Sequence, residues 1–586
     1  MAQTEWARVV AQTLEDAGVR LVIASPGSRS TPFLAALLRS RLRVIDVLDE
    51  RAAAFVALGV ARASGEPAAV LCTSGTAPGH WMPAVLEASA ACVPLILLSA
   101  DRPTELSLCG AQQTVDQLGL FGSHVRFFAD AGNPEAGEGS LAGLRRLVAR
   151  AVSEACGPIP GPVHLNLRAR KPLEPREPIG DVELATRRVA DGVLARPVVR
   201  SRSHVASEGR DLDDVASIVS ASERVLIVAG PLPVGLDAGA LHGLARRTGA
   251  AFAAELTSQV RFGGHGRRFD SFDGWLAAGL WHEPLTERAV ASPDVVVELG
   301  GPPTSGAYER WVARARPRRV VIGARSHADP HASAEHVLRG DVSEHARALT
   351  ARVRERPGGT GFAERLDELD REAEELASVQ AVRLGEAAIA RTLASRVPDT
   401  GRLVVGNSLP IRMLDRYAGR TIRTSRLDVV HQRGANGIDG LVSQTYGASL
   451  LDGRPAVALL GDLTLLHDVG ALATVRRASW PLVLVVVDNG GGRIFEGLPV
   501  AREAAWMMPH MITEEPVDHG ALCAAFGIAH ARVESQEELE GALEAGLARS
   551  GASMIVARVD PHGAARENRA FEAALSAALE ARRRSP

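Results

Sequence analysis

Short apolar runs alternate with alanine-rich stretches of helical periodicity along most of the chain. Helical stretches such as Arg51–Ser64 and Pro83–Ala91 separate the runs in the first third of the sequence. The runs expected to be strands there are Leu21–Ala24, Arg43–Leu48, Ala68–Cys72, Pro94–Ser99 and Val163–Leu167. Short, nearly continuous apolar runs fit strands buried on both faces, and helical crossovers between them produce a parallel sheet. The pattern therefore predicts an α/β fold built on parallel sheets.

The same pattern returns in two further blocks. The expected strands of the second block are Val225–Ala229, Val295–Leu299 and Arg319–Ile322. Those of the last block are Leu403–Val405, Ala456–Leu460, Pro481–Val487 and Met554–Val559. A chain of 586 residues is too long for one hydrophobic core, because chains longer than about 250–300 residues divide into several domains. We therefore expect three α/β domains with parallel sheets, at residues 1–185, 205–355 and 375–580.

Two segments of different composition separate the blocks. Residues 195–214 turn to Arg, Ser and acidic residues, and we expect a linker there that leads into a helix. The charged segment Arg354–Glu375, with Pro357, Gly358 and Gly359 near its start, marks the second boundary.

The composition of the chain indicates which kinds of molecule it can bind. The net charge is only −3, with 66 basic and 69 acidic residues, so nothing favours nucleic acid. The longest apolar runs, such as Pro481–Val487, are too short to span a bilayer. Lys171 is the only lysine, so anions must be met mainly by arginine guanidinium groups. We expect a soluble protein without nucleic-acid partners or membrane insertion.

The positions of the cysteines indicate the cellular compartment in which the protein is expected. They form no CxxC pair and stand mostly in apolar segments, which predicts reduced, buried thiols. They are Cys72, Cys92, Cys109, Cys156 and Cys523. The first 18 residues have helical periodicity and lack the basic start and apolar centre of a signal peptide. The expected location is the cytoplasm.

The segment ASPGSRSTPF, Ala24 to Phe33, follows an expected strand and is unusually polar. Pro26 and Gly27 are enough for a turn, and Ser30 or Thr31 can cap the following helix with Arg29 in solvent. Alternatively, the free N–H groups of a helix start beside a guanidinium form a site for a carboxylate or phosphate. These residues alone leave both interpretations open.

The last block places an acid and an amide after two successive strands. Asp462 ends one apolar run and Asn489 ends the next, followed by Gly490, Gly491 and Gly492. In a right-handed βαβ unit the two strand ends can lie close together. Hard oxygen donors beside a glycine-rich turn suit Mg²⁺ carrying a diphosphate. The alternative is a Rossmann-like turn in which Asp462 only caps a helix.

This GD…N arrangement resembles the diphosphate-binding motif of thiamine-diphosphate enzymes. The resemblance implies their fold, in which a pyrimidine-binding (PYR), a central and a diphosphate-binding (PP) domain match the three blocks. It also implies a glutamate that hydrogen-bonds the aminopyrimidine ring of the cofactor. Glu50, in VIDVLDERAAAFVALG, stands where a strand passes into a helix, as this role requires. Asp49 and Glu50 could otherwise be ordinary acids at a helix start.

Further segments resemble one family within this group. SPGSRSTP, DERAAAFVALG, TSGTA, LLSADRPTEL, GPVHLNL, GNSLPIR, RGANGIDG and DNGGGRIFEGLP are similar to segments of the 2-succinyl-5-enolpyruvyl-6-hydroxy-3-cyclohexene-1-carboxylate synthases of menaquinone biosynthesis. The resemblance implies decarboxylation of 2-oxoglutarate on thiamine diphosphate and 1,4-addition of the succinyl unit to isochorismate. It also implies a homodimer or homotetramer with the cofactor between two chains.

The resemblance assigns roles to individual residues, with Glu50 as the catalytic residue. The metal, Mg²⁺ or Mn²⁺, would be held by Asp462, Asn489 and Gly491. The cofactor-binding residues would be Glu50, Thr76, Asp462, Asn489, Gly490, Gly491, Ile494 and Phe495. The substrate-binding residues would be Ser28, Arg29, Arg102, Gln112, Gln113, Ser408, Arg412, Arg433, Phe495 and Leu498. Gln112 replaces the asparagine of a family Asn-Gln pair.

One segment departs from the family pattern. In LGGPPTSGAYERW, Leu299 to Trp311, the family commonly has a basic residue after the serine, whereas Gly306 and Ala307 follow Ser305 here. If this segment is helical, Arg310 lies about one turn further and could supply the missing charge. Two other functions remain open: another thiamine-diphosphate decarboxylase or carboligase, and a non-catalytic protein of the same fold. His80, His431 and His467 are too scattered to favour the first, and retention of Glu50 disfavours the second.

Overall fold

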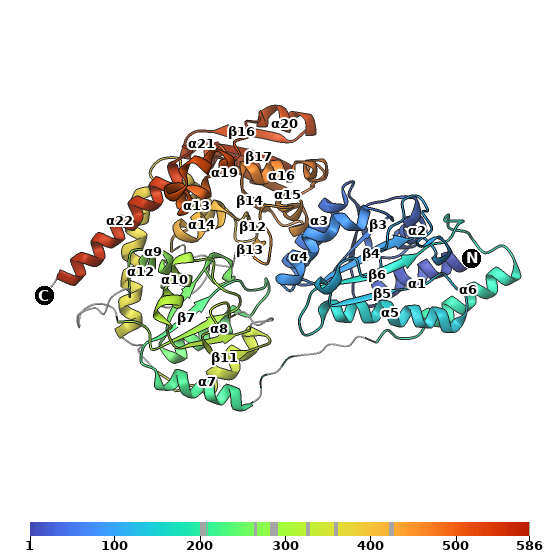
Figure 1. Ribbon diagram of the computed structural model, residues 1–586, viewed down its shortest axis with the longest axis horizontal. Helices are drawn as coiled ribbons and strands as arrows, with labels where there is room; N and C mark the ends of the chain where they lie inside the picture. The colour runs from blue at the N-terminus through green and yellow to red at the C-terminus, as the bar shows by residue number, and fades with distance from the viewer. Residues whose placement is uncertain are drawn as a thin grey trace. The chain divides into compact units, whose positions relative to one another are not determined.

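Three parallel sheets organise the chain. The computed structural model describes residues 1–199, 205, 207, 209–262, 267–281, 291–323, 329–356, 361–420 and 427–584 (Figure 1). It divides into two compact units. The first comprises Met1–His204, Gln432–Gly453 and His467–Arg477, and the second comprises Val205–His431, Arg454–Leu466 and Ala478–Pro586. The α/β class and the three parallel sheets expected from the sequence are confirmed.

The first sheet lies in the first unit and has the strand order β2-β1-β3-β4-β6-β5. Its strands are β1 (Leu21–Ala24), β2 (Arg43–Asp46), β3 (Ala68–Cys72), β4 (Leu95–Asp101), β5 (Phe127–Asp130) and β6 (Pro162–Arg168). Helices cover both faces. One face carries α1 (Ala2–Asp16), α2 (Thr31–Leu38) and α5 (Glu138–Cys156), and the other carries α3 (Glu50–Ser64) and α4 (Met82–Ala90) (Figure 1).

The other two sheets lie in the second unit. The five-stranded sheet has the order β11-β10-β9-β7-β8, and the other six-stranded sheet has the order β13-β12-β14-β15-β17-β16. The five strands are β7 (Val225–Ala229), β8 (Ala251–Ala254), β9 (Val295–Leu299), β10 (Arg319–Ile322) and β11 (Ala334–Leu338). The six are β12 (Arg402–Val405), β13 (Asp428–His431), β14 (Ala456–Gly461), β15 (Pro481–Asp488), β16 (Ala529–Val533) and β17 (Gly551–Arg558). Counted from its own first strand, this last sheet has the same strand order as the first sheet.

The remaining helices connect these strands. They are α6 (Asp181–Leu194), α7 (Gly209–Ala221), α8 (Ala238–Thr248), α9 (Phe272–Ala277), α10 (Gly306–Ala315), α11 (Val342–Thr350), α12 (Gly361–Gln380), α13 (Glu386–Arg396), α14 (Leu409–Tyr417), α15 (Leu441–Ala448), α16 (Asp462–His467), α17 (Leu472–Val475), α18 (Val500–Glu503), α19 (Met508–Ile512), α20 (His519–Phe526), α21 (Gln536–Ala548) and α22 (Gly563–Arg584).

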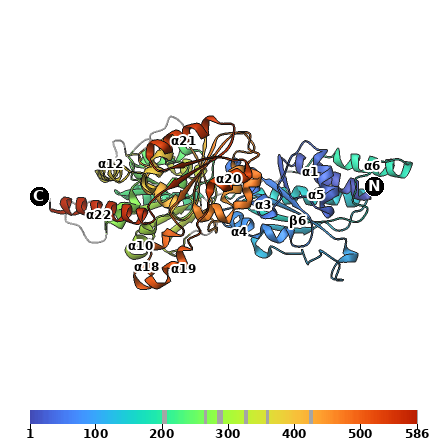
Figure 2. The ribbon, with the colours of Figure 1, turned by 90° about the horizontal axis from the view of Figure 1, so that it is seen from above.

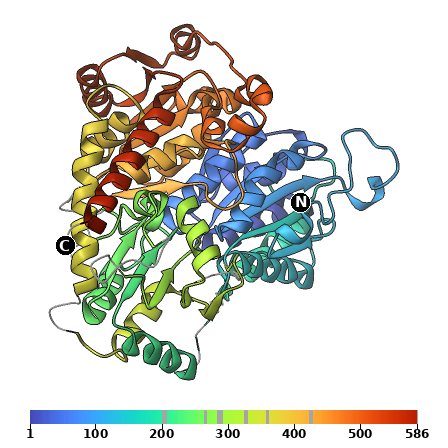
Figure 3. The ribbon, with the colours of Figure 1, turned by 60° about the vertical axis from the view of Figure 1, so that its left-hand side comes forward.

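The expected second boundary is largely helical. From Gly361 onward the charged segment belongs to α12, whose Phe362, Leu366 and Leu369 are buried in a core shared by the second and third sheets. Helices α12 and α22 lie side by side (Figure 3). Pro357, Gly358 and Gly359, and most of residues 200–208 in the expected linker, lie outside the described residues. The bounds given for the three domains stay predictions.

Strands in the sheet interiors were predicted better than those at the edges. Every interior strand was expected, with ends that differ by a few residues. Five strands were missed: β5, β8, β11, β13 and β16, all of which are edge strands. Three of them, β5, β11 and β16, are partly exposed and carry polar side chains. An edge strand has only one neighbouring strand, and these three lack the continuous apolar run used as the signal, whereas β8 and β13 are only four residues long.

Two glycines allow α3 to lie directly against α15 within the first unit. A Cβ on Gly59 would collide with the carbonyl oxygen of Gln444, and a Cβ on Gly447 would collide with that of Val56. Both helices are almost fully buried. This contact fixes the helix whose first residue is Glu50.

The cysteine prediction is partly wrong. Cys72, Cys92 and Cys523 are buried, but Cys109 and Cys156 are exposed; all five lie in the described residues and none forms a disulfide. Among the described residues, no helix is both long and apolar enough to cross a bilayer.

Candidate active site

The predicted site residues follow equivalent strands of the two six-stranded sheets. Loops after the carboxyl ends of parallel strands form the binding edge of such a sheet. After β1 to β4 come, in turn, Arg29, Glu50, Thr76 and Arg102; after β12 to β15 come Arg412, Arg433, Asp462 and Asn489. The shared strand order therefore gives each sheet one edge that collects polar side chains.

Asp462 is held at the carboxyl end of β14. Its Oδ2 accepts the N–H of Gly491 at 2.8 Å, and its Oδ1 accepts that of Leu463 at 2.7 Å. The residue is 8% exposed. Burial raises its pKa above the usual range, although these two N–H groups oppose the shift. The carboxylate lies directly over the glycine turn, where a cation would favour its charged form.

Asn489 follows the neighbouring strand β15. Its Nδ2 donates to Oε1 of Glu386 at 2.8 Å, and its buried Oδ1 has no hydrogen-bond partner among the described residues. Burial raises the pKa of Glu386 to about 7, and the nearby charges of Glu567 and Asp462 add to the shift. A buried acceptor without a donor is costly unless a ligand or ion satisfies it.

The glycine turn completes a possible cation site. Gly490 and Gly491 have φ of 75° and 108°, conformations that other residues rarely adopt. The carbonyl of Gly491 accepts the N–H of Arg493 at 2.8 Å and keeps a second lone pair. One carboxylate, one unsatisfied amide oxygen and one carbonyl suit Mg²⁺ bound together with phosphate oxygens and water. No group of three His, Cys, Asp or Glu side chains in the described part of the chain could hold a metal by itself.

Glu50 is the first residue of α3. The preceding Asp49 caps this helix by accepting the N–H of Arg51 at 2.8 Å. The carboxylate of Glu50 is partly buried and has no hydrogen-bond partner among the described residues. Burial, and then the charge of Glu50, raise the pKa of the Cys72 thiol at the end of β3. Glu50 is thus available to a ligand beside the ends of β2 and β3.

Arg29 and Arg102 line a common cavity of about 500 Å³ in the first unit, together with Gln112. Arg29 is buried; its Nη1 donates to the carbonyl of Ala169 at 2.7 Å, and its Nε has no acceptor within the described ranges. Burial and then the positive charge of Arg102 lower the pKa of Arg29. Two guanidinium groups that repel each other beside an open cavity favour an anionic ligand.

The other polar residues expected here lie on the loops around this edge. Ser28 begins the short 3-10 helix that contains Arg29. Gln113 donates from Nε2 to the carbonyl of Ser74 at 3.2 Å, and thereby fixes the loop that carries the exposed Thr76. Arg170 and Lys171 also line the cavity and were not predicted. Arg170 pairs with Glu105 at 2.6 Å.

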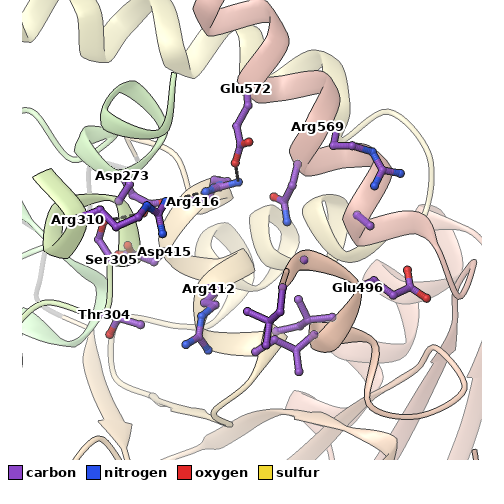
Figure 4. A pocket seen from close by; sticks show the side chains of 18 of the residues that line it. Asp273, Thr304, Ser305, Arg310, Arg412, Asp415, Arg416, Glu496, Arg569 and Glu572 are labelled. Carbon is purple, nitrogen blue, oxygen red and sulfur yellow. Dashed lines mark hydrogen bonds and ion pairs between the residues drawn. The ribbon is translucent and has the colours of Figure 1, made fainter. Parts of the chain in front are cut away.

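A second cavity, of about 320 Å³, lies within the second unit (Figure 4). The predicted residues Arg412, Ile494 and Leu498 line it, and so does Arg310. The segment after Ser305 is indeed a helix, α10, as the hypothesis for Arg310 required. Helix α10 contributes Gly306, Ala307 and Arg310 to the lining, and α18 contributes Arg502; the α18 and α19 labels lie next to each other in Figure 2. Ser408 and Phe495, also predicted, are not among its lining residues.

An ion-pair network holds the wall of the second cavity. Arg416 donates to Asp273 at 2.6 Å and to Glu572 at 2.8 Å, which joins α14 to α9 and α22 (Figure 4). Ser305 donates to Asp273 at 2.6 Å. Burial opposes ionisation of Asp273, but Arg416 and Ser305 keep its pKa below the usual range. Arg416 is therefore neutralised, whereas Arg310 has no hydrogen-bond or ion-pair partner among the described residues.

Ser408 has a strained backbone. Its φ of 69° is unusual for a residue other than glycine. It precedes α14, and its carbonyl accepts Nη1 of Arg412 at 2.8 Å. Such strain tends to persist where the surrounding structure needs it, often at binding sites. Phe495 belongs to a different segment, the 3-10 helix Arg493–Gly497, and its ring lies against Gly492.

Arg433 stands beside a loop anchored by a buried carboxylate. Glu87 of α4 accepts the backbone N–H groups of Gly434, Ala435 and Asn436 at 2.6–3.1 Å, and a guanidinium N–H of Arg62 at 2.7 Å. The Nε of Arg433 is buried and has no hydrogen-bond acceptor among the residues that the structure describes. Sequence reasoning missed Glu87, Glu386 and Arg416, because nothing local in a helix marks a side chain whose partners are distant in sequence.

Known proteins resemble the chain over nearly its whole length. Residues 4–120 match the family model of the thiamine pyrophosphate enzyme N-terminal TPP binding domain, and residues 425–557 match that of the C-terminal TPP binding domain. A 2-succinyl-5-enolpyruvyl-6-hydroxy-3-cyclohexene-1-carboxylate synthase of Sorangium cellulosum is 42% identical, over 96% of this chain and 94% of the relative. The chain belongs to this synthase family. Relatives of the same name from Halobacterium salinarum and Myxococcus xanthus are 38% and 37% identical, over 96% and 98% of this chain and 97% of each relative.

Membership of the synthase family confirms the resemblance expected from the sequence. The two domain matches make the protein a thiamine-diphosphate enzyme that forms carbon–carbon bonds. The matches cover the sheet edges that carry Glu50 and Asp462. The roles of single residues stay predictions.

Proposed function

We propose that this enzyme decarboxylates 2-oxoglutarate and adds the succinyl unit to isochorismate, giving 2-succinyl-5-enolpyruvyl-6-hydroxy-3-cyclohexene-1-carboxylate for menaquinone biosynthesis. The names of its relatives support this reaction. The observation that carries the proposal is the set of arginines at the two cavities, because both substrates are dicarboxylates. An enzyme for a monocarboxylate such as pyruvate would not need a cationic group away from the reacting carbon.

The chain's own residues can hold the cofactor. Asp462, the Oδ1 of Asn489 and the Gly491 carbonyl would bind Mg²⁺ or Mn²⁺, and the diphosphate would bind through this cation beside the turn at Gly490. When bound, thiamine diphosphate supplies a nucleophilic carbon and a sink for the electron pair released by decarboxylation. Glu50 would exchange a proton with the aminopyrimidine ring, since none of the described residues hydrogen-bonds its carboxylate. Thr76, Ile494 and Phe495 would contact the rest of the cofactor.

The arginines would orient the substrates. Arg29 and Arg102, with Ser28, Gln112 and Gln113 beside them, would bind one set of carboxylates. Arg412 would bind another, with Ser408, Ile494 and Leu498 around it. Arg433 would contribute from the loop anchored by Glu87. Fixed guanidinium groups lower the barrier by holding the two reactants in a reactive orientation.

Assembly and location complete the proposal. The active enzyme would be a homodimer or homotetramer in the cytoplasm, in which the cofactor lies between the first domain of one chain and the third domain of another. The three domains would span residues 1–185, 205–355 and 375–580.

A substrate-dependence assay tests the function. Purified protein with thiamine diphosphate, Mg²⁺ and 2-oxoglutarate should consume isochorismate, and omission of any component should stop the reaction. Pyruvate in place of 2-oxoglutarate should give no consumption, because it lacks the distal carboxylate. Equal rates with both oxoacids would instead favour a decarboxylase or carboligase of broader specificity.

Replacement of Glu50 tests its catalytic role. Glu50→Gln should leave the affinity for thiamine diphosphate nearly unchanged but lower kcat by at least about a hundredfold, the low end of general acid–base contributions. Calorimetry measures the affinity, and isochorismate consumption measures the rate. Glu66→Gln, an exposed acid after the same helix, serves as a control that should keep full activity. Normal turnover by Glu50→Gln would refute the assignment.

Replacement of Arg310 tests its contact with substrate. Arg310→Ala should raise KM for at least one substrate by about tenfold or more, because a hydrogen bond to a charged group contributes roughly 1.5–3 kcal/mol. The matched variant Arg314→Ala lies one turn further on α10, outside the cavity lining, and should leave both KM values unchanged. Unaltered KM values in Arg310→Ala would exclude the contact.

A further inference from the structure

Glu386 lies directly behind the candidate cation site. It is the first residue of α13 and is 5% exposed. Its Oε1 accepts Nδ2 of Asn489 at 2.8 Å. The oxygen of the same amide, Oδ1, is buried and finds no hydrogen-bond partner in the part of the chain that the structure describes. The carboxylate of Asp462, on the adjacent strand, is close enough for its charge to act on Glu386.

A carboxylate partner fixes which end of the amide faces the cation. The Glu386 oxygen that faces Asn489 accepts a hydrogen bond, so it pairs with the NH₂ group of the amide rather than with the amide oxygen. If the amide turned over, two oxygens would face each other, and an NH₂ group would point where a ligand oxygen is needed. The observed orientation leaves Oδ1 available on the side away from Glu386.

The position of Glu386 is itself fixed by the C-terminal helix. Glu567 of α22 accepts the N–H of Ala387 through Oε2 at 3.1 Å, at the start of α13. A Cβ on Gly385 would collide with the same carboxylate. Glu567 thus caps the first turn of α13 and fixes the backbone that carries Glu386.

We propose that Glu386 is a positioning residue that holds the side-chain oxygen of Asn489 toward the divalent cation. It touches neither metal nor substrate. A residue that hydrogen-bonds to a metal ligand affects metal binding, and its replacement typically weakens binding by about 10- to 100-fold. The proposal rests on the cation site of the proposed function, and it assigns that site a residue from outside the GD…N motif.

Mn²⁺ binding measured by electron paramagnetic resonance, in full-length protein with thiamine diphosphate, tests the proposal without reference to turnover. Glu386→Leu should raise the Kd for Mn²⁺ about tenfold or more, because the amide can then turn over. Glu386→Gln keeps an acceptor oxygen and should show a smaller loss. Glu298→Gln, a buried carboxylate of the central sheet that binds Arg319 and Tyr308, makes the same chemical change elsewhere and should leave the Kd unaltered.

A paired exchange separates positioning from general damage to the fold. Asn489→Asp alone places a second carboxylate against Glu386 and should weaken Mn²⁺ binding. Combining it with Glu386→Gln provides an amide that can donate to the new carboxylate, so the double variant should bind Mn²⁺ at least tenfold more tightly than Asn489→Asp. A purely structural role predicts that the two losses add.

The outcomes distinguish the two claims. If the wild-type protein binds no Mn²⁺ with the cofactor present, the cation site fails and this proposal fails with it. If the wild-type protein binds Mn²⁺ and the Glu386 variants bind it equally well, only the positioning role is overturned. If Glu386→Leu does not fold, the paired exchange decides, and simple additivity there overturns the proposal.

Discussion

The parallel pairing of β14 with β15 is the constraint on which the candidate site depends. Gly461 lies opposite Val487 in this ladder, so the backbone hydrogen bonds bring the ends of the two strands to one level. Asp462 and Asn489 then emerge side by side, and Asp462 reaches the N–H of Gly491. Neither residue could hold a cation alone. The register of two buried strands therefore converts two distant sequence positions into one set of oxygen donors.

Charge balance distinguishes structural arginines from those available to substrates. Arg416 is neutralised by Asp273 and Glu572, which ties three helices together around a cavity. Arg29 is buried beside Arg102 with an unsatisfied Nε, an arrangement that is costly without an anion. Since the chain contains a single lysine, recognition of carboxylates relies on guanidinium groups, whose planar donors fit a carboxylate with two bonds.

The sequence predicted those features that are encoded locally. Interior strands show continuous apolar runs, and Asp462, Asn489 and Arg29 each follow such a run. The edge strands β5, β8, β11, β13 and β16 were missed because one of their flanks has no partner strand and their sequences are short or polar. Cys109 and Cys156 were expected to be buried but are exposed.

Residues that act through tertiary contacts could not be found in this way. Glu87, Glu386 and Arg416 lie within helices and look like ordinary charged residues of a helical pattern. Their partners are separated from them by as many as 349 residues, as for Glu87 and Asn436. Only the folded chain shows that Glu87 anchors the loop beside Arg433, or that Glu386 orients Asn489.

The most direct test of the account is the mass of the product formed from isochorismate and uniformly ¹³C-labelled 2-oxoglutarate. The account predicts that one labelled carbon leaves as carbon dioxide and that the remaining labelled carbons appear in the product as a succinyl group. Labelled carbon dioxide without a labelled adduct of isochorismate would contradict the proposed acceptor and the roles given to the arginines. Absence of both, in protein that binds thiamine diphosphate, would contradict the reaction as a whole.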